Sequence, residues 1–511
     1  MIEITFTLPF LGHYQEMRLL TEFYERGWHR GAGFLVLYGR KGVGKTRLLK
    51  QFLQEQAISD SFYWQASLGD AEVQLHDFSQ ALLRYAPEQD ASLDPGFTFY
   101  NWRAALDYLA QIAERSDETK LFILEGFTDL CHQSMGLSSY FQHAWDHRLQ
   151  RISNLRLIIV GSHVSTMIRE VFAYSAPLYF RANAKLYLHP LSYTDLLDLF
   201  PHRTPEERLA IFTITGGIPA YLTYFVQTPD MRTAVDRLCF APDSSFLSDM
   251  ETLFDERFEE PELDRAILTA VANGNGDPDS LSQQVGLPFV DLERRLFFLG
   301  LMKLIEARHS VHDEGPRRRV RYTLAEPAFS FYCQHLEPVL REQTSSKETV
   351  ETTISVYVSL RQSLGREPFF ALCREWIWAA ARTTQLGMVP NRVGAYWDDL
   401  ALAPEFPIAV ADSWEKKLLV GVAFWENARL TTAVLEEIVH NSQQLTQVQV
   451  EGWTVAQIIF SRRPFTVEIQ AAASSAGVRL VTLAEIEPLL LAARRQKRWE
   501  LDNPQPVEIE F

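Results

Sequence analysis

The segment GRKGVGKT, residues 39–46, gathers residue types that together bind phosphate. It fits the pattern Gly-x-x-x-x-Gly-Lys-Thr without deviation. Glycines let backbone amides curl around a β-phosphate, Lys45 supplies a positive charge for the β- and γ-phosphates, and Thr46 offers a hydroxyl to a magnesium ion. The segment therefore predicts a nucleoside triphosphate site.

A second chemical position lies at the end of LFILEGFTDL, residues 121–130. A strand of this kind should end in two carboxylates, one beside the metal and one that orients the attacking water. Here Glu125 is followed by Gly126, which has no side chain. If Glu125 and Gly126 are aligned with the two expected acids in order, Glu125 takes the metal-side place and the water-orienting acid is missing. If the alignment is shifted by one residue, Glu125 becomes the base and Leu124 stands at the metal position. Asp129, or another loop acid, is the alternative source of the missing carboxylate.

The missing acid bears directly on turnover. A general base typically contributes about 10²–10⁴-fold in rate. Its loss predicts slow hydrolysis with nucleotide binding largely intact, so the sequence favours a nucleotide-dependent switch. A working ATPase with a displaced acid is the alternative, and a DNA-binding regulator that ATP merely stabilises is another.

These residues need a parallel sheet to position them. The apolar runs FLVLY (34–38) and LRLIIVGS (155–162) alternate with helical patterns, as in a βαβ sheet. After about Lys185 the strand patterns stop and helical ones follow, which predicts a lid. From Asp264, three helical segments precede two strand-like ones, the order of a helix-turn-helix with a wing. The expected fold is therefore an α/β nucleotide-binding domain (1–184), a helical lid (185–255), a winged helix (256–340), a linker (341–364) and a smaller α/β domain (365–511).

Composition sets outer limits on function. The 511 residues suggest three or four domains, and 47% hydrophobic with 22% charged residues is typical of a globular protein. A net charge of −16 works against non-specific binding to nucleic acid. The four cysteines show no metal-binding or disulfide spacing, the N-terminal residues do not form a signal peptide, and no apolar run is long enough for a membrane. We expect a cytoplasmic protein.

Five further segments, together with the phosphate loop, resemble the archaeal-type ATPases, a branch of the AAA+ and STAND-like P-loop proteins. They are PFLGHYQEM (9–17), LIIVGS (157–162), APLYFR (176–181), GGIPAYL (216–222) and RYTLAEPAFSFY (321–332). The resemblance implies ATP and Mg²⁺ as cofactors. It implies that Glu125 and Thr46 serve the metal and that Ser162 and Arg181 sense the γ-phosphate. The residues implied to bind nucleotide are Gly39, Gly42, Val43, Gly44, Lys45, Thr46, Arg47 and Pro219.

The last domain resembles the restriction-endonuclease-like domain of that family without its chemistry. Alignment places Pro407, Val422 and Phe424 where the family has its Asp, Glu and Lys. Apolar side chains do not hold a hard cation, which needs oxygen ligands. We therefore expect a nuclease fold without nuclease activity. Asp398, Asp399 and Asp412 are the alternative oxygen donors. The family also has a Glu on an upstream helix, which aligns near Phe370, with Glu367 and Glu375 close to it in the sequence.

Partners beyond ATP are weakly indicated. The wing segment GPRRRVRY carries Arg317, Arg318, Arg319 and Arg321, which suit phosphate contacts, while the helix before it mixes Asp291 and Glu293 with Arg294 and Arg295. DNA binding through the winged helix and docking of a protein, or self-association, both stay open. No membrane partner is expected.

Overall fold

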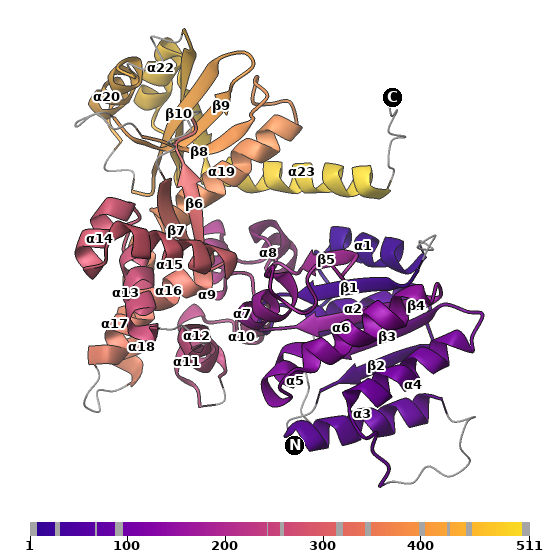
Figure 1. Ribbon diagram of the computed structural model, residues 1–511. Helices are drawn as coiled ribbons and strands as arrows, with labels where there is room; N and C mark the ends of the chain where they lie inside the picture. Colours follow the sequence, from indigo (N-terminus) through magenta and orange to yellow (C-terminus); the bar gives the residue numbers. More distant parts are fainter. Residues whose placement is uncertain are drawn as a thin grey trace. The chain divides into compact units, whose positions relative to one another are not determined.

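The computed structural model describes residues 8–25, 31–66, 69–86, 96–242, 244–255, 260–312, 320–342, 349–397, 404–426, 430–445 and 452–502. The chain forms two compact units. The first comprises Met1–Leu191 together with Ile218–Ala220, and the second comprises Ser192–Gly217 and Tyr221–Phe511. Figure 1 labels the elements of both.

The first unit is built on a five-stranded parallel sheet of order β2-β3-β4-β1-β5. Its strands are β1 (Gly33–Tyr38), β2 (Ser61–Gln65), β3 (Lys120–Glu125), β4 (Leu155–Gly161) and β5 (Ala184–Tyr187). This confirms the predicted α/β class. The last strand corrects one detail: the strand pattern does not stop at Lys185, because the short segment Ala184–Tyr187 pairs with β1.

Helices cover both faces of this sheet (Figure 1). Alternate residues of β1 explain why: Leu35 and Leu37 pack with α1 and α2, whereas Phe34 and Val36 pack with α3 to α6. Each of these side chains is fully buried, which contributes about 1.5–3 kcal/mol per residue. The helices are α1 (Tyr14–Glu25), α2 (Lys45–Glu55), α3 (Ala71–Tyr85), α4 (Trp102–Glu114), α5 (Phe127–Gln133), α6 (Leu137–His147) and α7 (Val164–Met167), with short turns η2 (Leu149–Arg151) and η3 (Ile168–Phe172).

The second unit begins with the helices expected as a lid: α8 (Tyr193–Leu199), α9 (Pro205–Thr215), α10 (Pro219–Gln227), α11 (Met231–Phe240) and α12 (Phe246–Asp255). Three helices and an antiparallel hairpin follow, in the order expected of a winged helix: α13 (Pro261–Ala272), α14 (Pro278–Val285), α15 (Phe289–Leu301), β6 (Ile305–His309) and β7 (Val320–Leu324). Three short elements come next: α16 (Pro327–Phe331), η4 (Tyr332–Leu336) and α17 (Glu337–Glu342).

The expected linker at 341–364 is mostly a packed helix. Helix α18 spans Thr349–Ser363 and contacts α11, and its Val356 and Leu360 side chains are fully buried. The polar stretch REQTSSKET favours a linker, but Thr353, Val356 and Leu360 form a buried stripe at helical spacing, while Ile354 and Val358 on the other side of the helix are exposed.

The last part of the chain forms a mixed sheet of order β12-β11-β10-β9-β8. Its antiparallel part is β8 (Arg392–Tyr396), β9 (Phe406–Asp412) and β10 (Lys417–Phe424), and β11 (Thr454–Ser461) and β12 (Arg479–Thr482) continue in parallel. The accompanying helices are α19 (Glu367–Arg382), α20 (Thr432–Gln443), α22 (Val467–Ala476) and α23 (Leu483–Asp502). The last part of the chain therefore combines a second sheet with helices.

A buried polar network joins α8 and α9 to α23 within the second unit. Arg208 of α9 donates two hydrogen bonds to the Glu487 carboxylate, at 2.9 and 2.6 Å. The Tyr193 hydroxyl donates to the same carboxylate at 2.7 Å. Two turns further along α23, Arg494 pairs with Asp195 and Asp198 at 2.9 and 2.8 Å. Because Arg208 and Glu487 are nearly inaccessible to water, neither charge tolerates loss of its partner.

We therefore expect Glu487→Ala to lower the free energy of unfolding by about 3 kcal/mol, since it leaves the Arg208 guanidinium buried and unpaired. Urea denaturation measures this change. The double variant Arg208→Met/Glu487→Leu should recover most of the loss, and Glu206→Ala, a partly buried acid on the same helix, should change stability by less than about 0.5 kcal/mol. Equal losses in the single and double variants would show that the ion pair is not what joins these helices.

Candidate functional site

The carboxyl ends of β1, β3 and β4 meet at one edge of the first sheet. The Gly39 amide donates to the Gly161 carbonyl at 3.3 Å, which ties the start of the phosphate loop to the end of β4. The Gly126 amide donates to the Val160 carbonyl at 3.1 Å, which ties the end of β3 to the same strand. Parallel strands thus bring the loop, Glu125 and Ser162 to one edge although the sequence separates them widely.

Lys45 is held within the phosphate loop. Its Nζ donates to the carbonyls of Gly39 and Arg40, both at 2.8 Å. Burial lowers the pKa of Lys45 to about 8, while the negative charges of Glu125 and Asp129 act in the opposite direction. The ammonium is therefore fixed where a triphosphate would lie along the loop.

Glu125 lies against Thr46, as the in-register alignment predicts. The Thr46 hydroxyl donates to one carboxylate oxygen and the Tyr63 hydroxyl donates to the other. In contrast, Leu124 is fully buried in the apolar core on the other face, which excludes it from a metal position. The adjoining Thr46 and Glu125 oxygens are the ligand type that Mg²⁺ requires, so the residues fit this ion. When bound, Mg²⁺ would neutralise phosphate charge.

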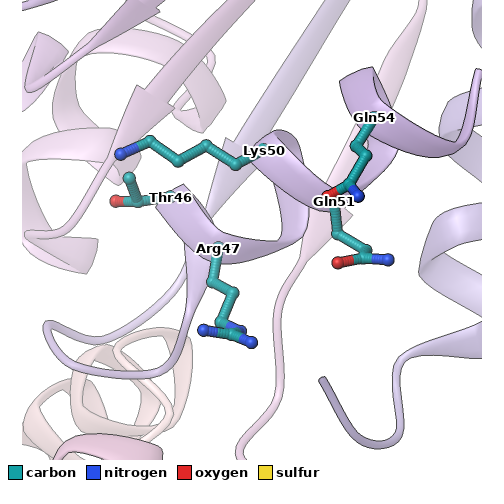
Figure 2. A pocket seen from close by; sticks show the side chains of 5 residues that line it. All are labelled: Thr46, Arg47, Lys50, Gln51 and Gln54. Carbon is teal, nitrogen blue, oxygen red and sulfur yellow. The ribbon is translucent and has the colours of Figure 1, made fainter. Parts of the chain in front are cut away.

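A pocket of about 350 Å³ opens beside Thr46 and follows α2. Figure 2 shows its five lining side chains, which project from successive turns of that helix: Thr46, Arg47, Lys50, Gln51 and Gln54. Arg47 and Lys50 give the pocket positive charge next to the hydroxyl that would serve the metal. An anionic ligand is therefore favoured here over a neutral one.

The chain re-enters the first unit at Ile218–Ala220, which brings Pro219 to the phosphate loop. The Ala220 amide donates to the Gly42 carbonyl at 3.3 Å. A Cβ atom at Gly42 would lie 2.8 Å from the Ala220 Cβ and 3.4 Å from Ile218, so this contact requires glycine at that position. Pro219 lies beside Gly44, with its Cγ 3.9 Å from the place of a Cβ there.

The two expected γ-phosphate sensors differ in their surroundings. Ser162 directly follows β4, and its amide donates to the Thr128 hydroxyl at 3.3 Å. Arg181 instead forms a double hydrogen bond with the Asp146 carboxylate of α6, at 3.0 and 2.8 Å. To reach a phosphate, Arg181 would have to leave this ion pair.

Phe180, beside Arg181, occupies a backbone conformation that glycine adopts more easily than other residues. Its φ is +58°, in the left-handed region, and its side chain is 81% exposed. The cost of this conformation for a non-glycine residue is about 1–2 kcal/mol.

Sequence reasoning missed Tyr63, Ile218, Ala220 and His163 as neighbours of the site. Tyr63 lies on β2, which pairs with β3, and hydrogen-bonds Glu125. Burial and the Glu125 carboxylate raise the pKa of Tyr63, which keeps this hydroxyl a donor. His163 could have been found as the residue after the sensor Ser162.

The three positions aligned with nuclease chemistry are apolar and packed. Val422 and Phe424 of β10 contact the core between the sheet and α20, and Pro407 lies on the neighbouring strand β9. Asp412 uses its carboxylate to accept the backbone amides of Val389, Trp414 and Glu415, at 3.1–3.2 Å.

The remaining acids of this region have separate roles. Glu367 pairs with Arg308 and Arg374, and burial together with the charge of Asp195 raises the pKa of Glu375 to about 7. Asp398 and Asp399 lie outside the described residues. Among the residues that the structure describes, no three His, Cys, Asp or Glu side chains gather as a metal site.

The segment after β6 contacts the last sheet. Ser310, which directly follows β6, forms an isolated bridge with Ala395 of β8, and the Val311 amide donates to the Ala395 carbonyl at 3.0 Å. Arg321 forms two hydrogen bonds with Glu405, at 2.9 and 2.6 Å, and its guanidinium lies over the Trp397 ring. Arg317, Arg318 and Arg319 lie outside the described residues.

Comparison with known proteins finds similarity to ATPase domains in the first part of the chain. A family described as an ATPase domain predominantly from Archaea matches residues 13–225. An uncharacterized protein of Methanocaldococcus jannaschii is 26% identical over 399 residues, which is 78% of this chain and 83% of that protein. No helix within the described part of the chain has the length and apolar character to cross a membrane.

Two solved structures are similar at lower identity. A Walker-type ATPase of Pyrococcus abyssi is 19% identical and covers 63% of this chain and 96% of its own, with a TM-score of 0.46. The ORC2 protein of Aeropyrum pernix, solved as ADPNP-ADP complexes, is 14% identical and covers 71% of this chain and 98% of its own, with a TM-score of 0.41.

We expect Lys45→Ala to weaken ATP binding at least about 10-fold, which corresponds to about 1.4 kcal/mol, because it removes the cation of the loop. Equilibrium binding of labelled ATP measures this. Glu125→Gln should instead reduce the gain in affinity that Mg²⁺ provides and leave metal-free binding near the wild-type value.

Arg103→Ala removes an exposed cation on α4 and serves as the matched control, with no expected change. Wild-type affinity in Lys45→Ala would show that ATP binds elsewhere.

Proposed function

Because residues 13–225 belong to a family of ATPase domains found predominantly in Archaea, we propose that this protein is an ATP-dependent switch with slow hydrolysis. ATP would bind along Gly42 to Thr46, with Mg²⁺ at Thr46 and Glu125. The proposal includes a cytoplasmic location, which the free cysteines favour.

One observation carries this proposal. Ile218–Ala220 belong to the first unit, where they contact the phosphate loop, whereas the residues before and after them belong to the second unit. The preceding helix α9 ends at Thr215, and Gly216 and Gly217 follow with φ values of +59° and +74°. A ligand in the loop would act directly on the segment against Gly42. A nucleotide shifts the protein between two arrangements only if it binds them with different affinity, and this contact supplies that difference.

The second unit would transmit the change as a connected body. Helix α9 carries Arg208, whose buried pairing with Glu487 ties it to α23. Helix α23 in turn contacts α19, which contacts β8, β9 and β10 of the last sheet. Motion of α9 would therefore carry α23 with it.

Slow hydrolysis follows from Gly126, which brings no carboxylate to the end of β3. The C-terminal domain completes the proposal as a nuclease-like fold without nuclease chemistry. Pro407, Val422 and Phe424 offer no oxygen ligands from their side chains, and Asp412 is committed to three backbone amides.

The partner of this switch is a protein in our proposal, and two features favour that over DNA. Arg321 is already paired with Glu405 and lies over Trp397. Helix α15, which would read bases in a winged helix, exposes apolar side chains, including Val290 at 68% and Phe297 at 69%. Base edges are read by polar side chains, whereas exposed apolar patches mark protein contacts.

The switch predicts that Mg²⁺-ATP slows hydrogen exchange in the last turn of α9 and the first turn of α10 by at least about 10-fold, because the bound state holds Ile218–Ala220 on the loop. Exchange with mass-spectrometric detection measures this. Ala220→Gly removes the methyl group that lies beside Gly42 while keeping the amide hydrogen bond to the Gly42 carbonyl, so it should reduce the response without loss of ATP binding.

Val226→Ala, further along α10, is the control and should keep the full response. Exchange that is identical with and without bound ATP would contradict the switch.

The preference for a protein partner predicts that duplex DNA binds only in the non-specific range, with Kd about 10⁻⁴–10⁻⁶ M at physiological salt. Fluorescence anisotropy measures this, and Arg321→Ala should leave it unchanged because Arg321 is engaged by Glu405. A Kd of about 10⁻⁸ M would favour the DNA-binding regulator instead, provided that the Kd increases steeply with salt concentration and also increases in Arg321→Ala.

A further inference from the structure

The missing acid leaves a defined space at the end of β3. Gly126 has φ +83° and precedes α5, and a Cβ there would lie 2.9 Å from the Ala66 Cβ. Both features oppose any side chain at this position. A hydrolytic carboxylate has to come from elsewhere in the chain.

Asp129 places a carboxylate in that space. Its Oδ2 lies 3.6 Å from the position that a Cβ of residue 126 would occupy. A glutamate at residue 126 would carry its own carboxylate oxygens at a comparable distance from that Cβ. Asp129 stands in the first turn of α5, and its side chain is 54% exposed, so water and substrate can reach it.

The charge of Asp129 is directed toward the phosphate loop. It raises the pKa of the Lys45 ammonium against the effect of burial, and Lys41 contributes to lowering the pKa of Asp129 itself. Both lysines belong to GRKGVGKT. Asp129 therefore lies within electrostatic reach of the place where the γ-phosphate would be.

His163, in the segment after the neighbouring strand β4, contacts this carboxylate. Its Nε2 lies 3.4 Å from Asp129 Oδ1, and this hydrogen bond is the main cause of the lowered pKa of Asp129. The His163 ring packs at 5.4 Å from His132, which pairs through Nε2 with the Thr166 hydroxyl at 2.7 Å. The pair thus joins the segment after β3 to the segment after β4, directly beside Ser162.

We propose that Asp129 is the catalytic carboxylate of this ATPase and that His163 is its positioning residue. Asp129 orients the attacking water and accepts its proton. The water oxygen forms a bond to the γ-phosphorus, the bond from that phosphorus to the bridging oxygen breaks, and ADP leaves with the electron pair. The products are ADP, inorganic phosphate and one proton, which Asp129 passes to solvent. This inference rests on the proposed switch and supplies its reset step.

The lowered pKa of Asp129 has a consequence for rate. A base whose pKa lies far below the operating pH is a weak proton acceptor, so the reaction is slower than with a well-matched base. Slow turnover is what a switch needs, because the ATP-bound arrangement must persist.

The test compares ATP binding with single-turnover phosphate release at saturating Mg²⁺-ATP. Asp129→Asn should bind ATP as tightly as the wild type or more tightly, since a negative charge near Lys45 is removed, and should release phosphate about 100-fold more slowly. Retained ATP binding shows that the variant is folded. Glu118→Gln, an exposed acid of the same unit, is the control and should match the wild type in both measurements.

The positioning role of His163 is tested with two substitutions. His163→Gln keeps an N–H donor for Asp129 and should retain a larger share of the rate than His163→Leu, with ATP affinity unchanged in both. Equal rates in these two variants would contradict positioning through that hydrogen bond.

Wild-type phosphate release in Asp129→Asn would overturn the inference. So would a wild-type protein that binds ATP for hours without releasing phosphate, although the switch itself would then stand. A wild-type protein that does not bind ATP would contradict the proposed function instead.

Discussion

The contact between Thr46 and Glu125 is the constraint around which the first unit is organised. The two residues begin α2 and end β3, and β4 lies between β3 and β1 in the sheet. A side chain can cross this distance only if all three strands end at the same level. The register meets that requirement, because Glu125 pairs with Val160 and Tyr38 with Gly161. The oxygens of Thr46 and Glu125, the loop lysine and Ser162 then share one edge, which is where we propose that Mg²⁺ and a triphosphate bind.

The second unit is connected to that edge by very little chain. Three residues, Ile218–Ala220, return to the phosphate loop, while α9 before them and the remainder of α10 from Tyr221 belong to the second unit. Those helices are not loosely attached to the last domain, because Arg208 and Glu487 form a buried pair between α9 and α23. This division of the chain is the basis on which we propose a nucleotide-dependent switch.

The sequence predicted the parts of the site that are contiguous or periodic. GRKGVGKT carries its chemistry in eight consecutive residues, and the strands around it have clear apolar patterns. The sequence left the register of Glu125 and the role of Asp129 open, because both depend on which strands are neighbours. It could not show that Asp146 holds Arg181 or that Glu405 holds Arg321, since these pairs are 35 and 84 residues apart. The expectation of a linker at 341–364 was wrong, because the structure has the helix α18 there. The prediction relied on the polar residues before α18 and overlooked the few buried positions within it.

The most direct test of the central claim is the distance between the two units with and without nucleotide. Spin labels at Tyr100→Cys and Val467→Cys report it by pulsed electron paramagnetic resonance, since both sites are exposed, at 95% and 81%. Burial raises the pKa of the native thiols Cys131, Cys239, Cys333 and Cys373, which makes the new sites react selectively. A switch predicts that Mg²⁺-ATP changes the distance distribution in the wild-type background and not in Lys45→Ala. An unchanged distribution in a protein with ATP bound would contradict it.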